Sequence, residues 1–237
     1  GEVCTIAATF TDVGTAASAC SAVTATGLQP AIMELLDAAA LTAIHELLGL
    51  AAPTPGAAHV TIQTDGAAAA ADAAAITAVL EAAGGTVAVS TDRDEGERLL
   101  AIRRSVHPAM ARLGTTLIED VSVPRSALAA MFARIADIER RYGLVIPTVA
   151  HAGDGNLHPN FIFDGPDVPA AIWEAADELF RAALELGGTL TGEHGIGVLK
   201  RRWLADELGD DQWELQRQIA RVFDPQGILN PGKVFGP

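Results

Sequence analysis

The alternation of short β-prone runs with long helical runs is the feature that most constrains the fold of this chain. The first β-prone run, residues 2–10, precedes a helical run that starts after Asp12, a good N-cap residue, and ends before Gly27, a good C-cap residue. The alternation continues, with strands expected at 31–37, 59–65, 86–90 and 115–123 and helices at 38–49, 66–83, 92–112 and 125–142. This order fits either a parallel βαβ sheet or the split βαβ arrangement of ferredoxin-like folds.

An Asp-Gly pair between two further β-prone runs indicates antiparallel pairing. Residues 145–151 and 157–163 flank Asp154-Gly155, and such a dipeptide between two strands is the strongest short signal for a β-hairpin. A hairpin requires that at least part of the sheet is antiparallel. We therefore predict an α+β fold with a ferredoxin-like antiparallel sheet covered by helices.

The pattern becomes mostly helical in the last third of the chain. Helices are expected at 167–187, 198–208 and 210–222, and an extended tail follows them. We therefore predict an α+β ferredoxin-like region over 1–165 and a mostly helical C-terminal extension over 166–237.

Composition and charge exclude several classes of partner. The chain has 16 Lys+Arg against 30 Asp+Glu, a net charge of -14, so it would repel nucleic acid and anionic membranes. Its two cysteines, Cys4 and Cys20, are too few for a disulfide framework or a thiolate metal site. No apolar run approaches the ~18 residues of a transmembrane segment and no leader is apparent, so we expect a cytoplasmic protein. Because the sequence begins with Gly1 and not with an initiator Met, we expect a fragment of a longer chain.

The hairpin would bring two histidines together. If Asp154 and Gly155 alone form the turn, His151 lies directly opposite His158, with Cβ atoms about 4.5–5.5 Å apart on one face of the sheet. Two imidazoles at that separation can bind one metal ion. Asn160 lies on the same face and could reach a substrate or a metal-bound group. The alternatives are two unrelated histidines, or a three- or four-residue loop that offsets the pair.

A glycine-rich segment supplies a carboxylate and a third imidazole. Glu193 and His194 lie between glycines in residues 187–197, just before an expected helix. Glu193 would complete a set of two histidines and one carboxylate, which is used by catalytic Zn²⁺ and by Mn²⁺ or Fe²⁺. His194 would then be free to act as a general base near neutral pH. The alternative is a glycine-rich turn with a solvated Glu-His pair.

Three motifs, taken together, resemble the C-terminal region of FAD-linked oxidases. They are HAGDGNLHPN (151–160), GEHGIG (192–197) and LNPGKVF (229–235), and they occur in the family's order. This family includes D-lactate dehydrogenases, the D subunit of glycolate oxidase and D-2-hydroxyglutarate dehydrogenase. The resemblance implies a substrate domain whose FAD is bound mainly by a separate N-terminal domain, which is absent from this chain.

The resemblance also implies roles for individual residues. His151, His158 and Glu193 would bind a divalent metal, Zn or Mn, that holds a 2-hydroxy acid, and His194 would remove the hydroxyl proton as hydride passes to the flavin. Arg103 would bind the substrate carboxylate, with the adjacent Arg104 as the alternative, and Asn160 would contact the substrate. The residues implied near the flavin are Gly195, Asn230 and Lys233.

Two departures from the family bear on the substrate. Ile118 stands where some 2-hydroxyglutarate enzymes have a lysine, and Leu100 replaces an aromatic residue common before the arginine. Ile118 offers no positive charge to a second substrate carboxylate, so lactate- or glycolate-type acids are favoured.

The predicted function is that of the substrate domain of an FAD-dependent 2-hydroxy-acid dehydrogenase, inactive as a fragment. Its partners would be a small 2-hydroxy acid and its own N-terminal FAD domain; a homodimer is compatible with the sequence, and the electron acceptor stays open. One alternative is a stand-alone metal-dependent hydrolase, in which His151, His158 and Glu193 hold Zn²⁺ and His194 activates water. A non-catalytic interaction subunit is the other.

Overall fold

One antiparallel sheet organises the molecule. The computed structural model describes residues 2–235, and eight strands follow the order β4-β1-β3-β2-β7-β8-β5, with β6 also paired to β8. Every strand pair in the described residues is antiparallel, which confirms the ferredoxin-like alternative. The strands are β1 (Val3–Phe10), β2 (Ile32–Leu36), β3 (Ala58–Asp65), β4 (Thr86–Ser90), β5 (Thr115–Ile118), β6 (Val121–Ser122), β7 (Thr148–His151) and β8 (Asn156–Phe163).

The sheet consists of two split βαβ units joined edge to edge. In the first unit β1 lies between β4 and β3, and β2 forms the inner edge. In the second unit β6 lies between β8 and a bridge at Thr189, and β7 forms the inner edge. The two inner edges pair, with Glu34, Leu35 and Leu36 opposite His151, Ala150 and Val149. The recurrence of β-α-β seen in the sequence is therefore a structural duplication that extends to residue 189.

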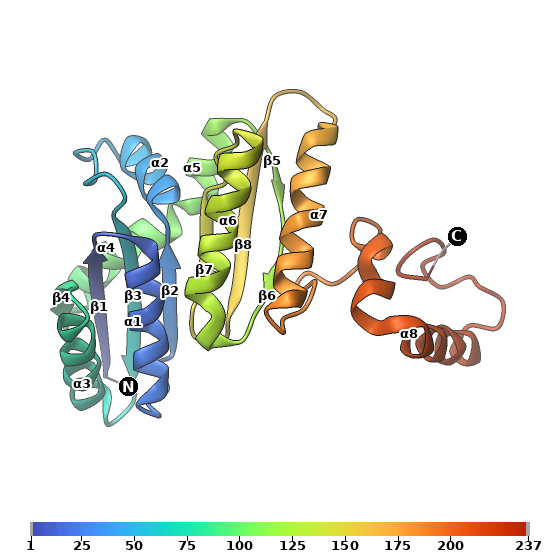
Figure 1. Ribbon diagram of the computed structural model, residues 1–237. Coiled ribbons are helices and arrows are strands. Elements are labelled where there is room, and N and C mark those ends of the chain that lie inside the picture. The colour runs from blue at the N-terminus through green and yellow to red at the C-terminus, as the bar shows by residue number, and fades with distance from the viewer. Residues whose placement is uncertain (1, 236–237) are drawn as a thin grey trace.

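Helices cover one face of both units (Figure 1). Helices α1 and α3 lie over the first unit, and α6 and α7 over the second. The helices are α1 (Val13–Ala25), α2 (Ala38–Leu48), α3 (Ala69–Ala82), α4 (Arg93–Arg104), α5 (Val106–Leu113), α6 (Leu128–Tyr142), α7 (Ala170–Glu185) and α8 (Leu204–Phe223), with 3-10 turns at Arg125–Ala127 and Arg201–Trp203.

The two faces of the sheet differ in polarity, and this difference places the site. In β1 the alternate residues Ile6, Ala8 and Phe10 enter the main core under α1 and α3. The other face carries Thr5, and a smaller apolar cluster from α2, α5, β2 and β7 covers part of it. Val149 of β7 belongs to this cluster, whereas His151 of β7 and His158 of β8 do not.

Capping side chains fix the helix starts and connect the two units. Asp12 caps α1 as the sequence predicts, accepting a hydrogen bond from the Thr15 amide at 2.8 Å. Asp37 accepts from the Ala40 amide at the start of α2 and from the Thr148 amide of β7, both at 2.8 Å. One carboxylate thus begins α2 and anchors the joint between β2 and β7.

Two predicted elements are interrupted, and the predicted break between the last two helices is present. The helix expected over 92–112 breaks at Ser105 into α4 and α5, because Pro108 cannot donate to the carbonyl four residues earlier and its ring would clash with it. The strand expected over 115–123 breaks at Glu119 and Asp120, which leave the ladder between β5 and β6. The last two helices form α8, with a non-helical kink at Gly209.

The predicted register of the β7-β8 hairpin is wrong. His151 pairs with Asn156 and His158 pairs with Val149, because residues 152–155 form a four-residue loop. The Gly155 amide donates to the His151 carbonyl at 3.0 Å, which closes the longer turn. The offset is two residues, so both histidines keep the same face of the sheet, whereas an odd offset would have separated them.

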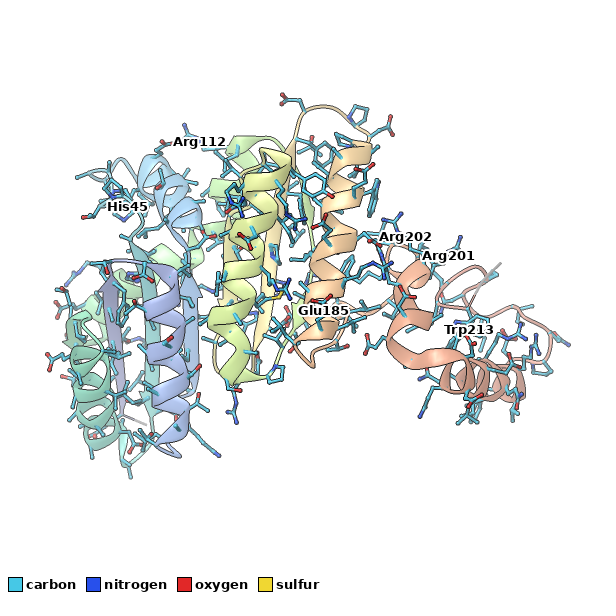
Figure 2. All side chains as sticks on the ribbon, in the orientation of Figure 1. His45, Arg112, Glu185, Arg201, Arg202 and Trp213 are labelled. Carbon is cyan, nitrogen blue, oxygen red and sulfur yellow. The ribbon has the colours of Figure 1, made fainter. Side chains whose placement is uncertain are left out.

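The C-terminal extension projects from the edge of the second unit. Figure 1 shows α8 and the tail beyond α7, and Figure 2 places Arg201 and Arg202 where the extension begins and Trp213 on α8. Leu215, Ile219, Val222 and Phe223 lie along α8 and are each about half or more exposed. The expected division after residue 165 falls in the β8-α7 loop, and α7 packs into the main core. In the described residues no helix is both long and apolar enough to span a bilayer.

The four-residue loop yields a testable prediction about Gly155. Its φ is +88°, and a Cβ there would lie 2.1 Å from the Val123 carbonyl oxygen. Gly84 also has a φ of +88°, but a Cβ there meets nothing within 4 Å. Both Ala variants carry the left-handed cost of about 1–2 kcal/mol. We expect Gly155→Ala to lose roughly 1–3 kcal/mol more than Gly84→Ala, measured by urea unfolding, because only it forces atoms apart. Equal losses would contradict the described packing.

Candidate active site

The side chains of the three predicted metal ligands lie close together. His151 ends β7, His158 lies on β8, and Glu193 comes from the glycine-rich loop that follows α7. One ligand atom from each side chain lies within 4.8 Å of the others. Glu193 Oε1 is 3.1 Å from His158 Nε2 and 3.7 Å from His151 Nε2. The donor set, two imidazoles and a carboxylate, suits a divalent transition metal.

His194 lies against this cluster. Its ring stacks on His158 with centroids 5.0 Å apart, and its Nε2 is 3.8 Å from Glu193 Oε1. Its side chain is 46% exposed, so it retains access to the open side of the site. A third imidazole is therefore adjacent to the three ligands and can exchange a proton with a bound molecule.

A cavity of about 170 Å³ opens beside the cluster. This is well below the roughly 300–1,000 Å³ of pockets for drug-sized ligands, so it suits a small molecule. The lining combines these polar groups with the aliphatic side chains of Val106, Ile118 and Val149. The full lining is Arg103, Val106, His107, Ile118, Val149, His151, His158, Asn160, Glu193 and His194.

Arg103 reaches the cavity from the end of α4. Its Nε donates to Glu34 Oε2 at 2.8 Å, which leaves the two terminal nitrogens available to a ligand. Arg104 points elsewhere and forms an ion pair with Glu97 on the same helix. The geometry therefore favours Arg103 over Arg104 as a ligand contact.

Asn160 is tied to the backbone. Its Nδ2 donates to the carbonyl oxygens of Pro147 at 2.9 Å and His158 at 2.8 Å, and the residue is buried. Its carbonyl oxygen is thus the part that can meet a molecule in the cavity. His107, which the sequence analysis did not single out, lines the same cavity four residues after Arg103.

Glu34 is a site residue that sequence reasoning missed. It lies on β2 directly opposite His151, and its Oε1 is 2.7 Å from His151 Nδ1. No local motif marks it, because Glu34 lies more than a hundred residues before His151 and only the joint between the two units brings them together. The one available signal was a single acidic residue inside an otherwise apolar strand, IMELL.

Asp120 holds the glycine-rich loop in place and was also missed. Its carboxylate accepts hydrogen bonds from three successive amides, those of residues 192–194, and from the Thr191 hydroxyl. Burial alone would raise the pKa of Asp120, but these hydrogen bonds and the nearby Lys200 charge lower it to about 2. An ionised Asp120 therefore fixes the backbone that presents Glu193.

Gly192 allows the loop to approach the sheet. A Cβ at this position would lie 2.3 Å from Oδ1 of Asn156, whose amide nitrogen is 3.5 Å from His158 Nε2. Any side chain at position 192 would push the loop, and with it Glu193, away from the histidines.

Lys200 is buried behind the loop with two carboxylates. It donates to the backbone carbonyls of Asp120 and, at 2.9 Å, Leu190, and it is 3.8 Å from Glu119 Oε2. Burial lowers the pKa of the Lys200 ammonium, opposed by Asp120 and Glu119. This lysine thus fastens the segment between β5 and β6 to the glycine-rich loop.

The pKa values of His151 and His158 are shifted in opposite directions. The hydrogen bond with Glu34 is the main reason that the pKa of His151 is raised, while burial and then the neighbouring His151 lower the pKa of His158. His158 therefore presents a neutral imidazole, the form that binds a metal.

The residues expected near a flavin lie outside this cavity. Gly195 is in the glycine-rich loop, whereas Asn230 and Lys233 line a groove of about 520 Å³ between the tail and the end of α8. The tail is bound back to the loop region, since the Val234 amide donates to the Gly197 carbonyl at 2.8 Å. The structure thus groups the predicted metal and substrate residues but places the two tail residues apart from them.

Comparison with known proteins identifies the family. Residues 2–234 match the family described as FAD linked oxidases, C-terminal domain. The chain belongs to this family. The glycolate oxidase subunit GlcD of Bacillus subtilis (strain 168) is 38% identical over 238 residues, covering 98% of this chain and 50% of the relative. GlcD of Escherichia coli (strain K12) is 31% identical and covers 95% and 46%. D-lactate dehydrogenase of Archaeoglobus fulgidus is 37% identical over 149 residues, covering 62% and 33%.

Solved structures share the fold at low identity. p-Cresol methylhydroxylase with substrate bound matches with a TM-score of 0.66 and 13% identity, covering 99% of this chain and 53% of that one. The 4-ethylphenol oxidase from Gulosibacter chungangensis matches with a TM-score of 0.65 and 16% identity, covering 98% and 53%. The chain spans about half the length of the GlcD relatives and of these structures.

The buried carboxyl of Glu119 predicts a pH dependence of stability. Burial, opposed by Lys200, raises the pKa of Glu119 from 4.5 to about 7. The folded chain then keeps this proton where the unfolded chain has lost it, so this residue's contribution to stability falls as pH rises from about 4.5 to about 7. In urea unfolding between pH 5 and 7.5, the stability of Glu119→Gln relative to wild type should increase with pH. A constant difference across this range would contradict a protonated Glu119.

Proposed function

We propose that this chain is the substrate-binding part of an FAD-dependent 2-hydroxy-acid dehydrogenase of the glycolate or D-lactate type. The observation that carries the proposal is the cluster of His151, His158 and Glu193 beside Arg103 in one small cavity. A metal site next to a guanidinium matches the two ends of a 2-hydroxy acid. The family membership and the names of the GlcD and D-lactate dehydrogenase relatives support the same assignment.

His151, His158 and Glu193 would hold a divalent ion, Zn or Mn. When bound there, the ion supplies a Lewis acid that polarises substrate oxygens. The chain's own contribution is to keep three ligand atoms close together and to leave the cavity side open. That open side is where the hydroxyl and carboxylate oxygens of the acid would bind.

Arg103 would bind the substrate carboxylate. Its terminal nitrogens are free because Glu34 takes only Nε, and a guanidinium binds a carboxylate through two parallel hydrogen bonds. This positive group offsets the acidic field of the chain locally. Asn160 would contact the substrate through Oδ1, because its amide nitrogen is held by the backbone.

His194 would accept the hydroxyl proton as the C–H hydride leaves for FAD. It lies beside the ligand cluster and is partly exposed, and an imidazole is the side chain that most often serves as a general base. The aliphatic lining from Val106, Ile118 and Val149 would face the rest of the acid. A hydrogen or methyl substituent, as in glycolate or lactate, suits such a wall better than a second carboxylate.

FAD would be held mainly by an N-terminal domain, the half of the relatives that this chain does not span. The apolar side chains exposed along α8 are suited to packing against such a domain. Gly195, Asn230 and Lys233 would then approach the flavin from the loop and the tail. The cytoplasmic location, the homodimer and the division after residue 165 stay predictions.

Metal content tests the ligand set. We expect the purified chain, dialysed against Zn²⁺ or Mn²⁺ and then metal-free buffer, to retain about one ion, and His158→Ala to lose it because a ligand is removed. His45→Ala is the control, since His45 lies on α2 away from the cavity (Figure 2). Elemental analysis measures both variants. Equal metal content in wild type and His158→Ala would contradict the assignment.

Ligand binding tests the role of Arg103. In isothermal titration of the Mn²⁺-loaded chain with glycolate, Arg103→Ala should bind roughly 10–150-fold more weakly, as expected from about 1.5–3 kcal/mol for a charged hydrogen bond. The control, Arg104→Ala, removes the neighbouring guanidinium, which is paired with Glu97 outside the cavity.

A larger loss in Arg104→Ala than in Arg103→Ala would contradict this assignment. Hydrolysis of esters or amides by the zinc-loaded chain, together with no binding of glycolate or D-lactate, would favour the metal-dependent hydrolase instead.

A further inference from the structure

We infer that Glu34 is a positioning residue that orients both a metal ligand and the substrate arginine, and so couples the two halves of the site. The inference rests on the function proposed above and adds a residue that none of the predicted motifs contains. It is carried by one carboxylate that uses its two oxygens for two different site residues. Oε1 contacts His151 Nδ1 at 2.7 Å, and Oε2 accepts from Arg103 Nε at 2.8 Å.

The location of Glu34 argues against an incidental surface contact. The residue is only 8% exposed and lies on β2, next to the joint between the two units. Removing a carboxylate from water is costly unless it is paired and hydrogen-bonded, and both partners of Glu34 belong to the candidate site. Each carboxylate oxygen faces a nitrogen of one partner, Nδ1 of His151 or Nε of Arg103, so both contacts favour the ionised carboxylate.

The first contact determines which nitrogen His151 offers to a metal. A carboxylate at Nδ1 holds the proton there, so the lone pair of a neutral ring is on Nε2. That nitrogen is the one that faces Glu193, at 3.7 Å from Oε1. Without Glu34, His151 would lose both the fixed tautomer and the fixed ring orientation.

The second contact determines how Arg103 presents its guanidinium. The side chain projects from the last turn of α4, and Glu34 holds its inner nitrogen. The planar group is then fixed at Nε, which leaves both terminal nitrogens for a molecule in the cavity that Arg103 lines. Since His151 belongs to the second unit and Glu34 to the first, one carboxylate sets the relative placement of metal ligand and arginine.

The substitution Glu34→Gln separates these roles from simple packing. Glutamine keeps the shape but offers one carbonyl oxygen and one NH₂ group in place of two acceptors. If the NH₂ group faces His151, it favours the tautomer with the proton on Nε2 and blocks the metal. If it faces Arg103, two donors oppose each other. Either arrangement breaks the contact with one half of the site and weakens the contact with the other, because a neutral amide oxygen replaces a carboxylate oxygen, while the volume of the side chain is preserved.

The chain provides a matched control in Glu97→Gln. Glu97 pairs with Arg104, the residue next to Arg103, but both side chains are exposed and lie on α4 outside the cavity. This variant removes the same charge and the same type of ion pair from the same helix.

The first experiment measures Zn²⁺ affinity by competition with a chromophoric chelator, on the whole chain, with folding monitored by circular dichroism. We expect Glu34→Gln to bind Zn²⁺ roughly 10–100-fold more weakly than wild type, the usual effect of losing an outer-shell partner, and Glu97→Gln to match wild type. When wild type and Glu34→Gln are both saturated with Mn²⁺, glycolate should bind the variant at least about fivefold more weakly. The reason is that Arg103 has lost the charged hydrogen bond that fixes its guanidinium.

Unchanged Zn²⁺ and glycolate affinities in a folded Glu34→Gln protein would overturn the inference while leaving the proposed function intact. Failure of wild type to bind Zn²⁺ would instead overturn the proposed function itself.

A second measurement on the wild-type protein keeps the inference testable if Glu34→Gln does not fold. In ¹H–¹⁵N NMR spectra of the Zn²⁺-loaded chain, the His151 ring should carry its proton on Nδ1 and bind metal through Nε2, with its signals assigned by their loss in His151→Ala. Metal bound through Nδ1 would overturn the role of Glu34.

Discussion

The antiparallel pairing of β2 with β7 is the interaction on which the site depends. It merges two split βαβ units into one sheet and places Glu34 directly across from His151. Asp37 reinforces this joint because its carboxylate caps α2 and also accepts a hydrogen bond from the Thr148 amide of β7. Neither unit alone contains the site, because the first supplies Glu34 and the second supplies both histidines. The chemistry therefore lies where the two units meet.

Around this joint, buried charges act mainly on the backbone. The Asp120 carboxylate accepts hydrogen bonds from amides of the glycine-rich loop. Lys200 donates to carbonyl oxygens of the same loop and of the segment between β5 and β6. These interactions explain how Glu193, from a loop rich in glycine, is held near His151 and His158 on two strands. Gly192 contributes by its missing side chain, since any Cβ would collide with Asn156. The loop is therefore held by hydrogen bonds to one buried acceptor, Asp120, and one buried donor, Lys200.

Local patterns in the sequence were sufficient for much of this architecture. The Asp12 cap and the strand-helix alternation predicted the elements, and the Asp154-Gly155 pair predicted a hairpin with both histidines on one face. The register was wrong because turn length depends on contacts of the loop with Val123 and Met33, which are distant in sequence. Glu34 and Asp120 were missed for the same reason, since the partners of Glu34 are 69 and 117 residues away and those of Asp120 are at least 71 residues away. The grouping of Arg103 with the histidines came from family resemblance alone, because no spacing rule connects the end of α4 with β7.

The central claim is that one metal and one carboxylate share the cavity between the two units. Crystals of the chain soaked with Mn²⁺ and glycolate test it most directly through anomalous scattering. The account predicts one anomalous peak bounded by His151 Nε2, His158 Nε2 and Glu193 Oε1, with the glycolate carboxylate against the terminal nitrogens of Arg103. A metal bound elsewhere with this cluster empty, or glycolate bound away from Arg103, would contradict it.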